Sequence, residues 1–191
     1  MKIVFATNNL NKLKEIQQIL PSMELLSLKD IGFEGEIPED YETLEENAFQ
    51  KAQYIFDRYK IPCFADDTGL EVESLNGAPG VYSARYAGED CIADNNMRKL
   101  LSEMQGTANR RAAFKTVVAF VTDTEKRAFE GVAEGVILYE KQGIDGFGYD
   151  PIFKPLSYNL SFAEMSAAEK NKISHRGKAV RKFADYISSI R

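Results

Sequence analysis

The sequence is poor in the residues that build disulfides and soft-metal sites. Its 191 residues include two cysteines, Cys63 and Cys91, one histidine, His175, and no tryptophan. Two distant cysteines outside any C-x-x-C pair exclude a disulfide framework and a thiolate zinc site. A single histidine excludes a multi-histidine metal centre within one chain.

Long apolar runs and an excess of positive charge are also lacking. No apolar run approaches the ~20 residues that span a membrane, and the initial MKIVFATNN is too short and polar for a signal peptide. The chain has 24 basic and 29 acidic residues, a net charge of −5, whereas proteins that coat nucleic acid are normally basic. We therefore expect a cytoplasmic protein with no nucleic-acid or membrane partner. A small polyanion, which needs only a local positive pocket, remains a candidate ligand.

The residues that are present indicate one folded domain. Hydrophobic residues make up 44% and charged residues 28%, which excludes a disordered or fibrous chain. The length allows a single ordinary domain over 1–191, long enough to bury a core without metal or disulfide support.

Hydrophobic periodicity predicts alternating strands and helices. Strands are expected at 2–7, 61–65, 70–73, 111–121 and 126–139, and helices between the first strand and Pro21, at 43–59, around 97–104 and after Ser174. Residues 66–69, Asp-Asp-Thr-Gly, are predicted to form a turn. Because strands and helices interleave and include one long hairpin, we expect an α/β fold with a mixed sheet.

One candidate anion site lies where the first strand ends and a helix begins. Its residues are Thr7, Asn8, Asn9, Leu10, Asn11 and Lys12. Free backbone N–H groups and the helix dipole favour an anion there, and Lys12 adds a positive charge. The alternative is an ordinary helix cap with a solvated lysine.

Two adjacent aspartates, Asp66 and Asp67, form a candidate metal site. Neighbouring carboxylates repel each other unless a cation compensates them, and oxygen ligands beside phosphate suit Mg²⁺. Glu39, Asp40 and Glu42, in an acidic run before the 43–59 helix, could add a carboxylate. The alternatives are a plain turn, a solvated acidic face, or half of an aspartic protease dyad. The dyad is disfavoured because it needs an apolar neighbourhood.

Two further segments could recognise a planar group. Phe147, Gly148, Tyr149 and Asp150 place aromatic side chains beside a carboxylate on a tight turn, and stacking a base there would contribute about 1–3 kcal/mol. The alternative is a loop that buries Phe147 in the core. Basic residues at the start of the last helix oppose its dipole, which hints at a function for Lys170, His175 and Arg176, although a solvated terminus explains them equally well.

Taken in order, these segments closely resemble the inosine triphosphate pyrophosphatase family of non-canonical purine nucleoside triphosphate pyrophosphatases. The matching stretches span nearly the whole chain: FATNNLNKLKEI, TLEENAFQKA, ADDTGLEVESLNGAPGVYSARYAG, GFGYDPIF and AEMSAAEKNKISHRGKA. The resemblance implies an elongated mixed sheet flanked by helices in two lobes with a central cleft, and a homodimer. The implied activity is Mg²⁺-dependent hydrolysis of ITP, dITP and XTP to the monophosphate and pyrophosphate, which cleanses the nucleotide pool.

The resemblance also assigns roles by position. It implies that the 7–12 loop and Lys51 bind the triphosphate. Asp67, with Asp66 beside it, would bind Mg²⁺ and act as the general base, and Thr68 would contact the substrate. The resemblance gives base recognition to the Phe147–Asp150 turn with Lys170, His175 and Arg176. Arg176, a donor-only side chain, would donate a hydrogen bond to the 6-oxo group of inosine or xanthosine and would find no acceptor in the 6-amino group of adenine.

Two departures from the family pattern leave details open. Asn8 stands where the family usually has glycine, and the loop shape could survive because asparagine tolerates left-handed backbone. Pro38 stands where the family commonly has its metal-binding glutamate, so we expect Glu39, with Asp40 as the fallback. The remaining alternatives are a pyrophosphatase with a different base preference and a non-catalytic nucleotide-binding module.

Overall fold

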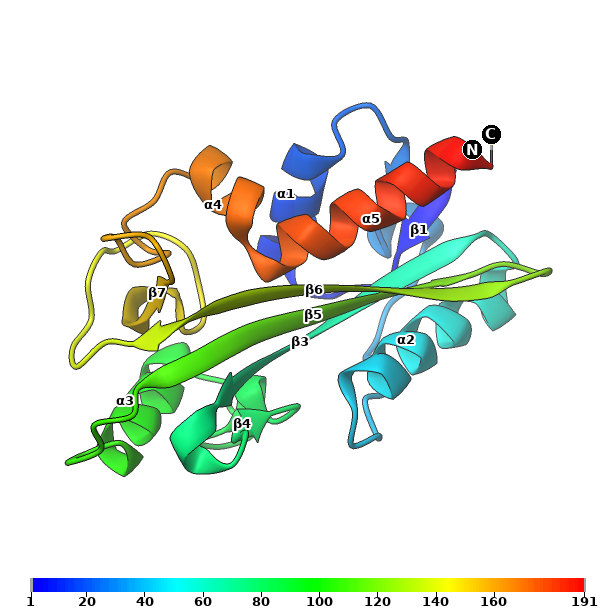
Figure 1. Cartoon of the computed structure of the whole chain (residues 1–191). Coiled ribbons are helices and arrows are strands. Elements are labelled where there is room, and N and C mark those ends of the chain that lie inside the picture. The colour runs from blue at the N-terminus through cyan, green and yellow to red at the C-terminus, as the bar shows by residue number, and fades with distance from the viewer. Residues whose placement is uncertain (1, 191) are drawn as a thin grey trace. The chain divides into compact units, whose positions relative to one another are not determined.

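The computed structural model describes residues 2–190 and contains a mixed α/β fold (Figure 1). Its helices and strands within those residues are β1 (Ile3–Phe5), α1 (Leu10–Ile19), β2 (Leu25–Leu26), α2 (Leu44–Tyr59), β3 (Cys63–Val72), β4 (Pro79–Gly80), α3 (Ala93–Glu103), β5 (Arg111–Val121), β6 (Lys126–Ile137), β7 (Phe153–Pro155), α4 (Ala167–Ile173) and α5 (His175–Ser189). The sheet order is β2-β1-β3-β5-β6-β7, with β4 paired to β3. β1 runs parallel to β2 and β3, whereas β4 and β7 pair antiparallel. The predicted α/β class with a mixed sheet is confirmed.

The chain divides into two compact units. Unit 1 comprises residues 2–67, 116–131 and 176–190 of the described chain, and unit 2 comprises 68–115 and 132–175. The division falls within β3, β5 and β6, so each of these long strands contributes residues to both units.

Unit 1 has helices on both faces of its strands. Phe5, Phe64 and Phe120 pack with α1 and α5 on one face, while their strand neighbours pack with α2 on the other (Figure 1). Successive side chains of a strand point to opposite faces, so an unbroken apolar run such as Ile3–Phe5 is buried on both sides. Both helices that begin near the candidate site carry side-chain caps, Asn9 on α1 and Thr43 on α2.

Unit 2 has its own apolar core. α3 contributes Met97 and Leu100, β5 contributes Phe114, and the segment around β7 contributes Phe153 and other buried apolar residues. Gly135 allows a close approach, because a Cβ there would lie 2.5 Å from the carbonyl oxygen of Lys154.

The predicted turn at 66–69 is wrong. Asp66, Asp67, Thr68 and Gly69 lie inside β3, which runs without a break from Cys63 to Val72. The Asp and Gly residues of this segment favoured a turn, but the strand continues through it. Lys12, Lys51 and Arg176 compensate the charges of its two carboxylates. The short strands β2 and β7 and the helix α4 were not predicted, although Ser166 and Glu169 form a capping box at α4.

Among residues 2–190, no helix combines the length and the hydropathy needed to cross a membrane.

Candidate functional site

Unit 1 gathers charged side chains around the Asp66–Asp67 pair. They come from several segments: Lys12 and Glu15 on α1, Glu39 before α2, Lys51 on α2, Asp66 and Asp67 on β3, and Arg176 in the first turn of α5. Asp66, Asp67, Lys51 and Arg176 are all buried. Charged groups are rarely buried unless they are paired. Here each aspartate has its own cations: Lys12 and Arg176 pair with Asp66, and Lys51 pairs with Asp67.

Asp66 is held by two cations. Lys12 Nζ lies 3.1 Å from its Oδ1, and Arg176 Nε donates a hydrogen bond to its Oδ2 at 3.0 Å. Burial by itself would raise the pKa of Asp66, but the charges of Lys12 and Arg176 outweigh burial and hold the pKa well below its usual range. A carboxylate bound this way stays ionised and is a poor proton acceptor.

Asp67 has the opposite character. Burial raises the pKa of Asp67 above its usual value, and the nearby ammonium of Lys51 offsets this only in part. Lys51 Nζ donates to Asp67 Oδ1 at 2.9 Å. Of the two neighbours, Asp67 is therefore the better proton acceptor. The general-base role that the sequence resemblance implies for Asp67 stays a prediction.

Glu39 converges on the same lysine. Its Oε1 accepts a short hydrogen bond from Lys51 Nζ, so a Glu39 oxygen and an Asp67 oxygen flank one ammonium. Asp40 instead pairs with Gln50, whose Nε2 donates to Asp40 Oδ2 at 2.6 Å. Glu39, and not Asp40, is thus the acidic residue of the run that lies near Asp67.

The pair Glu39 and Asp67 fits a hard divalent cation. Within residues 2–190 no group of three or more histidine, cysteine, aspartate or glutamate side chains forms a ready-made metal cage. Mg²⁺ does not need one, because it usually takes one or two carboxylates and completes its shell with water and substrate phosphate.

The 7–12 loop is tied down by its own side chains. Asn9 Oδ1 accepts hydrogen bonds from the backbone N–H groups of Asn11 and Lys12, and Thr7 Oγ1 accepts one from Asn9. Asn8 Nδ2 donates to the carbonyl of Gly35 at 3.0 Å. An anion at this helix end would therefore share the N–H groups with Asn9. Leu10 is 78% exposed, which leaves this turn open to solvent.

The backbone at Asn8 does not need a left-handed conformation. Asn8 is not among the residues of the described chain that have a positive φ. Asparagine in place of the family glycine therefore causes no left-handed strain in the loop, whose shape does not depend on asparagine's tolerance of left-handed backbone.

In unit 2 the predicted base-recognition residues form a second set. Lys170 Nζ donates to Asp150 Oδ2 at 2.7 Å, and the same oxygen accepts the backbone N–H of Phe147 at 2.8 Å. The Lys170 ammonium also lies 4.9 Å from the centre of the Phe147 ring. Gly146 has a φ of +77° and a Cβ there would lie 2.3 Å from Asp150, so the turn requires glycine.

The aromatic residues of this set differ in exposure. Tyr149 is buried and its hydroxyl donates to the carbonyl of Ser83 at 2.8 Å, whereas Phe147 and Gly148 are half-buried. His175 is buried and stacks on Phe114, with ring centres 4.5 Å apart. Of the two aromatic side chains on the predicted platform, only Phe147 can offer part of a ring face to a ligand.

The predicted residues therefore divide between the units. Unit 1 holds the 7–12 loop, Glu39, Lys51, Asp66, Asp67 and Arg176, and unit 2 holds Thr68, residues 147–150, Lys170 and His175. Arg176 was predicted with the base-recognition residues, but it lies with the carboxylates of unit 1 and its Nη1 also donates to Glu15. Glu15 was missed, and its position one turn after Lys12 on the same helix was the available signal.

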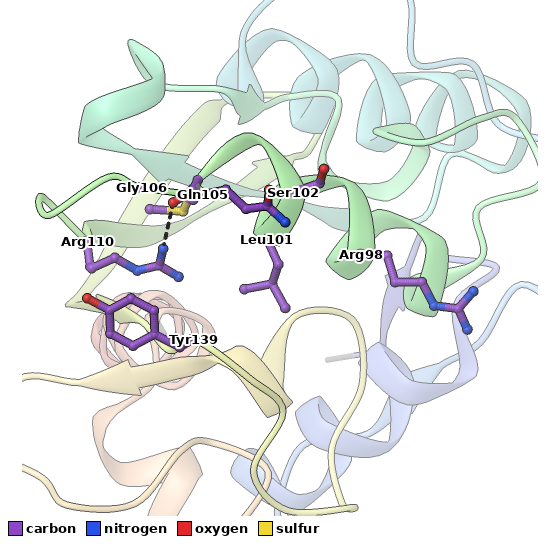
Figure 2. Close-up of a pocket in the computed structure, with 8 residues that line it drawn as sticks. Arg98, Leu101, Ser102, Gln105, Gly106, Arg110 and Tyr139 are labelled. Atoms are coloured by element: carbon purple, nitrogen blue, oxygen red, sulfur yellow. Dashed lines mark hydrogen bonds between the residues drawn. The ribbon is translucent and has the colours of Figure 1, made fainter.

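A pocket of about 400 Å³ in unit 2 contains none of these residues. It lies at the end of α3 and is lined by Arg98, Leu101, Ser102, Met104, Gln105, Gly106, Arg110 and Tyr139 (Figure 2). The Arg110 guanidinium donates to the backbone carbonyls of Met104, Ile137 and Leu138. These bonds occupy Arg110, and the other arginine of the pocket, Arg98, pairs with Asp94.

The mixed sheet and the buried clusters of carboxylates and lysines are typical of an α/β enzyme that acts on a phosphorylated small molecule. The sequence model of the Ham1 family matches residues 3–186, and the chain belongs to that family. Over an alignment of 192 positions the chain is 51% identical to the dITP/XTP pyrophosphatase of Flavobacterium johnsoniae, which covers 100% of both chains. It is 52% identical to the enzyme of the same name from Flavobacterium psychrophilum, over 99% of this chain and 100% of that one. The solved Ham1 protein of Staphylococcus aureus is 35% identical over 100% of both chains, with a TM-score of 0.91.

Proposed function

We infer that this chain is a dITP/XTP pyrophosphatase, a hydrolase that converts non-canonical purine nucleoside triphosphates to the monophosphate and pyrophosphate. The observation that carries this inference is the full-length match, at about half identity, to relatives that bear this name. The carboxylate and lysine cluster of unit 1 supports it, because hydrolysis of a phosphoanhydride needs cations for the phosphates and a base for water.

Unit 1 would bind the triphosphate. Lys12 and Lys51 provide two ammonium groups beside the N-terminus of α1, where the helix dipole favours negative charge. A nucleoside triphosphate carries several negative charges into a protein of net charge −5, so the two lysines, the helix N-terminus and the divalent cation would have to neutralise them together.

Asp67 is the proposed general base. Its raised pKa suits a group that takes a proton from the attacking water, whereas Asp66 stays bound to Lys12 and Arg176 and orients them. Mg²⁺ would be held by Asp67 and Glu39, and when bound it supplies charge to polarise the phosphate and to stabilise the leaving pyrophosphate.

Unit 2 would recognise the base. Phe147 offers a partly exposed ring, and Asp150, Lys170 and His175 supply polar groups beside it. Arg176 remains our predicted donor to the 6-oxo group. Since Arg176 also holds Asp66, Arg176→Ala should lower all rates, and its role in recognition is tested by the ratio of ITP to ATP hydrolysis. An unchanged ratio would exclude that role.

Several finer predictions accompany this function. We propose a homodimer, two lobes with a central cleft for the nucleotide, and a cytoplasmic location, where nucleotide pools are maintained. The family resemblance supports the first two and the proposed substrate supports the third. A pyrophosphatase with a different base preference is the alternative.

The test is pyrophosphate release from ITP, XTP, dITP, GTP, ATP and dTTP with Mg²⁺, for the wild type and Asp67→Asn. We expect fast release from ITP, dITP and XTP, little from the others, and a loss of at least about 100-fold in Asp67→Asn. Equal release from every nucleotide would keep the chemistry and exclude the base-recognition roles. Binding without release would instead indicate a nucleotide-binding module.

A further inference from the structure

A lysine ammonium lies between the two carboxylates that we assign to the metal ion. Lys51 Nζ donates to Asp67 Oδ1 at 2.9 Å and makes a short hydrogen bond to Glu39 Oε1. The side chain of Lys51 is 6% exposed and that of Asp67 is 10% exposed. A positive charge of the chain itself therefore already neutralises the two carboxylates that would hold a divalent cation.

We propose that Lys51 is an exchangeable counter-ion. In the nucleotide-free protein it neutralises Glu39 and Asp67, and it leaves them when the divalent cation binds, so that its ammonium becomes available to the substrate phosphates. This inference rests on the proposed function, because it takes Glu39 and Asp67 as the metal carboxylates.

The electrostatics around Lys51 favour such an exchange. The Asp67 side chain is 10% exposed and the Glu39 side chain 39% exposed; two ionised carboxylates that approach one another are stabilised by a compensating cation, and Lys51 supplies it. An ammonium and a divalent cation repel each other at short range, so the two compete for the same pair of carboxylates. A divalent cation must therefore break the ion pairs of Lys51 with Glu39 and Asp67, and this cost lowers the metal affinity of the nucleotide-free protein.

The exchange also couples the two ligands. Nucleotide phosphates give the displaced ammonium a new anionic partner, so the metal and the nucleotide each favour binding of the other, and the coupling is reciprocal. Lys51 therefore links the charge state of the carboxylates to the presence of substrate.

Lys12 provides a matched control in the same cluster. Its ammonium lies 3.1 Å from Asp66 Oδ1, and its side chain is 15% exposed. Asp66 keeps Arg176 as a second partner when Lys12 is removed. Lys12→Met and Lys51→Met each remove one positive charge from unit 1, but only Lys51→Met frees Glu39 and Asp67.

The experiment measures binding of Mg²⁺ alone by calorimetry, and of Mn²⁺ alone by electron paramagnetic resonance, to the nucleotide-free proteins at pH 8. We expect Lys51→Met to bind both ions at least about tenfold more tightly than the wild type, and Lys12→Met to change affinity less than about threefold. Equal affinities in wild type and Lys51→Met, or equal gains in both variants, would overturn the exchange.

A second measurement needs only a folded wild type. The ¹⁵N resonances of the lysine ammonium groups are followed as Mg²⁺ is added, with Lys51 assigned through Lys51→Arg. We expect the Lys51 resonance to move and the Lys12 resonance to stay nearly constant. A Lys51 resonance that stays constant at saturating Mg²⁺ contradicts the proposal.

Hydrolysis of dITP by the wild type separates this inference from the proposed function. Hydrolysis together with an unchanged metal affinity in Lys51→Met overturns the exchange and leaves the function. Tighter metal binding in Lys51→Met without hydrolysis by the wild type overturns the function and leaves the exchange.

Discussion

The two units bury charge in different ways. Unit 1 packs three basic and four acidic side chains into one cluster: Lys12, Lys51, Arg176, Glu15, Glu39, Asp66 and Asp67. Unit 2 buries the ion pair of Lys170 and Asp150 among aromatic rings. A cluster of many charges can exchange one counter-ion for another, whereas the Lys170–Asp150 pair is held against aromatic ring faces.

This contrast corresponds to two kinds of ligand group. A triphosphate with its cation brings many charges, and a site for it must rearrange several counter-ions as they arrive. A purine base is planar and uncharged, and a site for it needs a ring face and a few fixed donors and acceptors. The difference between the units therefore predicts different consequences for substitutions in each.

The largest effect on stability is expected for Asp66→Asn. The change leaves Lys12 and Arg176 buried with less negative charge around them, and breaking a buried pair on one side typically costs about 3–5 kcal/mol. Urea unfolding at pH 7 measures this loss. Asp123→Asn, at an exposed position in a turn, is the control and should stay within about 0.5 kcal/mol of the wild type. A loss below about 1 kcal/mol for Asp66→Asn would mean that Lys12 and Arg176 are compensated by other acidic groups and do not depend on the Asp66 charge.

A smaller loss is expected for Asp150→Asn in unit 2. The asparagine oxygen can still accept the Phe147 N–H, and the rings of Phe147 and Phe162, 4.9 and 5.7 Å from the Lys170 ammonium, compensate part of the lost charge. We expect a destabilisation of about 2–3 kcal/mol.

A double-mutant cycle of Asp150→Asn with Lys170→Met measures the direct coupling between these two residues. Because Asp150 and Lys170 contact each other directly, the sum of the stability losses in the two single variants should exceed the loss in the double variant by at least about 0.5 kcal/mol. Additive losses in urea unfolding would show that Asp150 and Lys170 are stabilised mainly by other neighbours, and the contrast between the units would fail.

A more local effect is expected for Phe147→Ala. If this ring stacks on the base, dITP affinity should fall by about 1–3 kcal/mol, as measured by calorimetry with Ca²⁺ in place of Mg²⁺. Tyr149→Phe is the control: it removes only the hydroxyl bonded to the Ser83 carbonyl, so it should cost about 1 kcal/mol of stability and leave dITP affinity unchanged. Equal affinity losses in both variants would remove Phe147 from base recognition.

The sequence predicted most of the fold because the long elements carry strong periodic signals. The helix predicted at 43–59 forms α2, which buries the helically spaced Ala48, Ala52 and Ile55, and β5 spans the predicted 111–121. β2 has two residues and β7 has three, too few for a periodic pattern to appear. The Asp-Asp-Thr-Gly segment failed for a different reason, because its turn preference was outweighed by tertiary ion pairs that sequence spacing does not show.

Several residues of the unit 1 charged cluster carried a signal in the sequence, but their pairing did not. Family motifs named Asp66, Asp67, Lys12 and Lys51, and all four lie in one charged cluster of unit 1. Which lysine contacts which aspartate depends on how α1 and α2 cross β3, and no local pattern encodes that. The burial of Arg176 against Asp66 likewise joins residues 110 positions apart.

The smallest effects are expected at the helix caps that position one lysine in each unit. Thr43 caps α2, which carries Lys51, and Ser166 caps α4, which carries Lys170. Thr43→Ala should cost about 1 kcal/mol, as N-cap truncations typically do. Ser166→Ala should destabilise unit 2 by a similar mechanism, since it removes the acceptor for the Glu169 N–H.

The Ser166 cap should also depend on pH in a defined direction. Hydrogen bonds from the Ser166 hydroxyl and backbone hold the pKa of Glu169 below its usual value, so the folded state binds the ionised carboxylate more strongly than the unfolded state does. This contribution is complete above the unfolded pKa, about 4.3, and is lost as pH falls through the lower, folded-state pKa. The Tm of the wild type should therefore exceed that of Glu169→Gln at pH 7, and this difference in Tm should shrink on acidification to about pH 3. A difference that is constant over this range would show that the α4 cap, and with it the placement of Lys170, does not depend on the Glu169 charge.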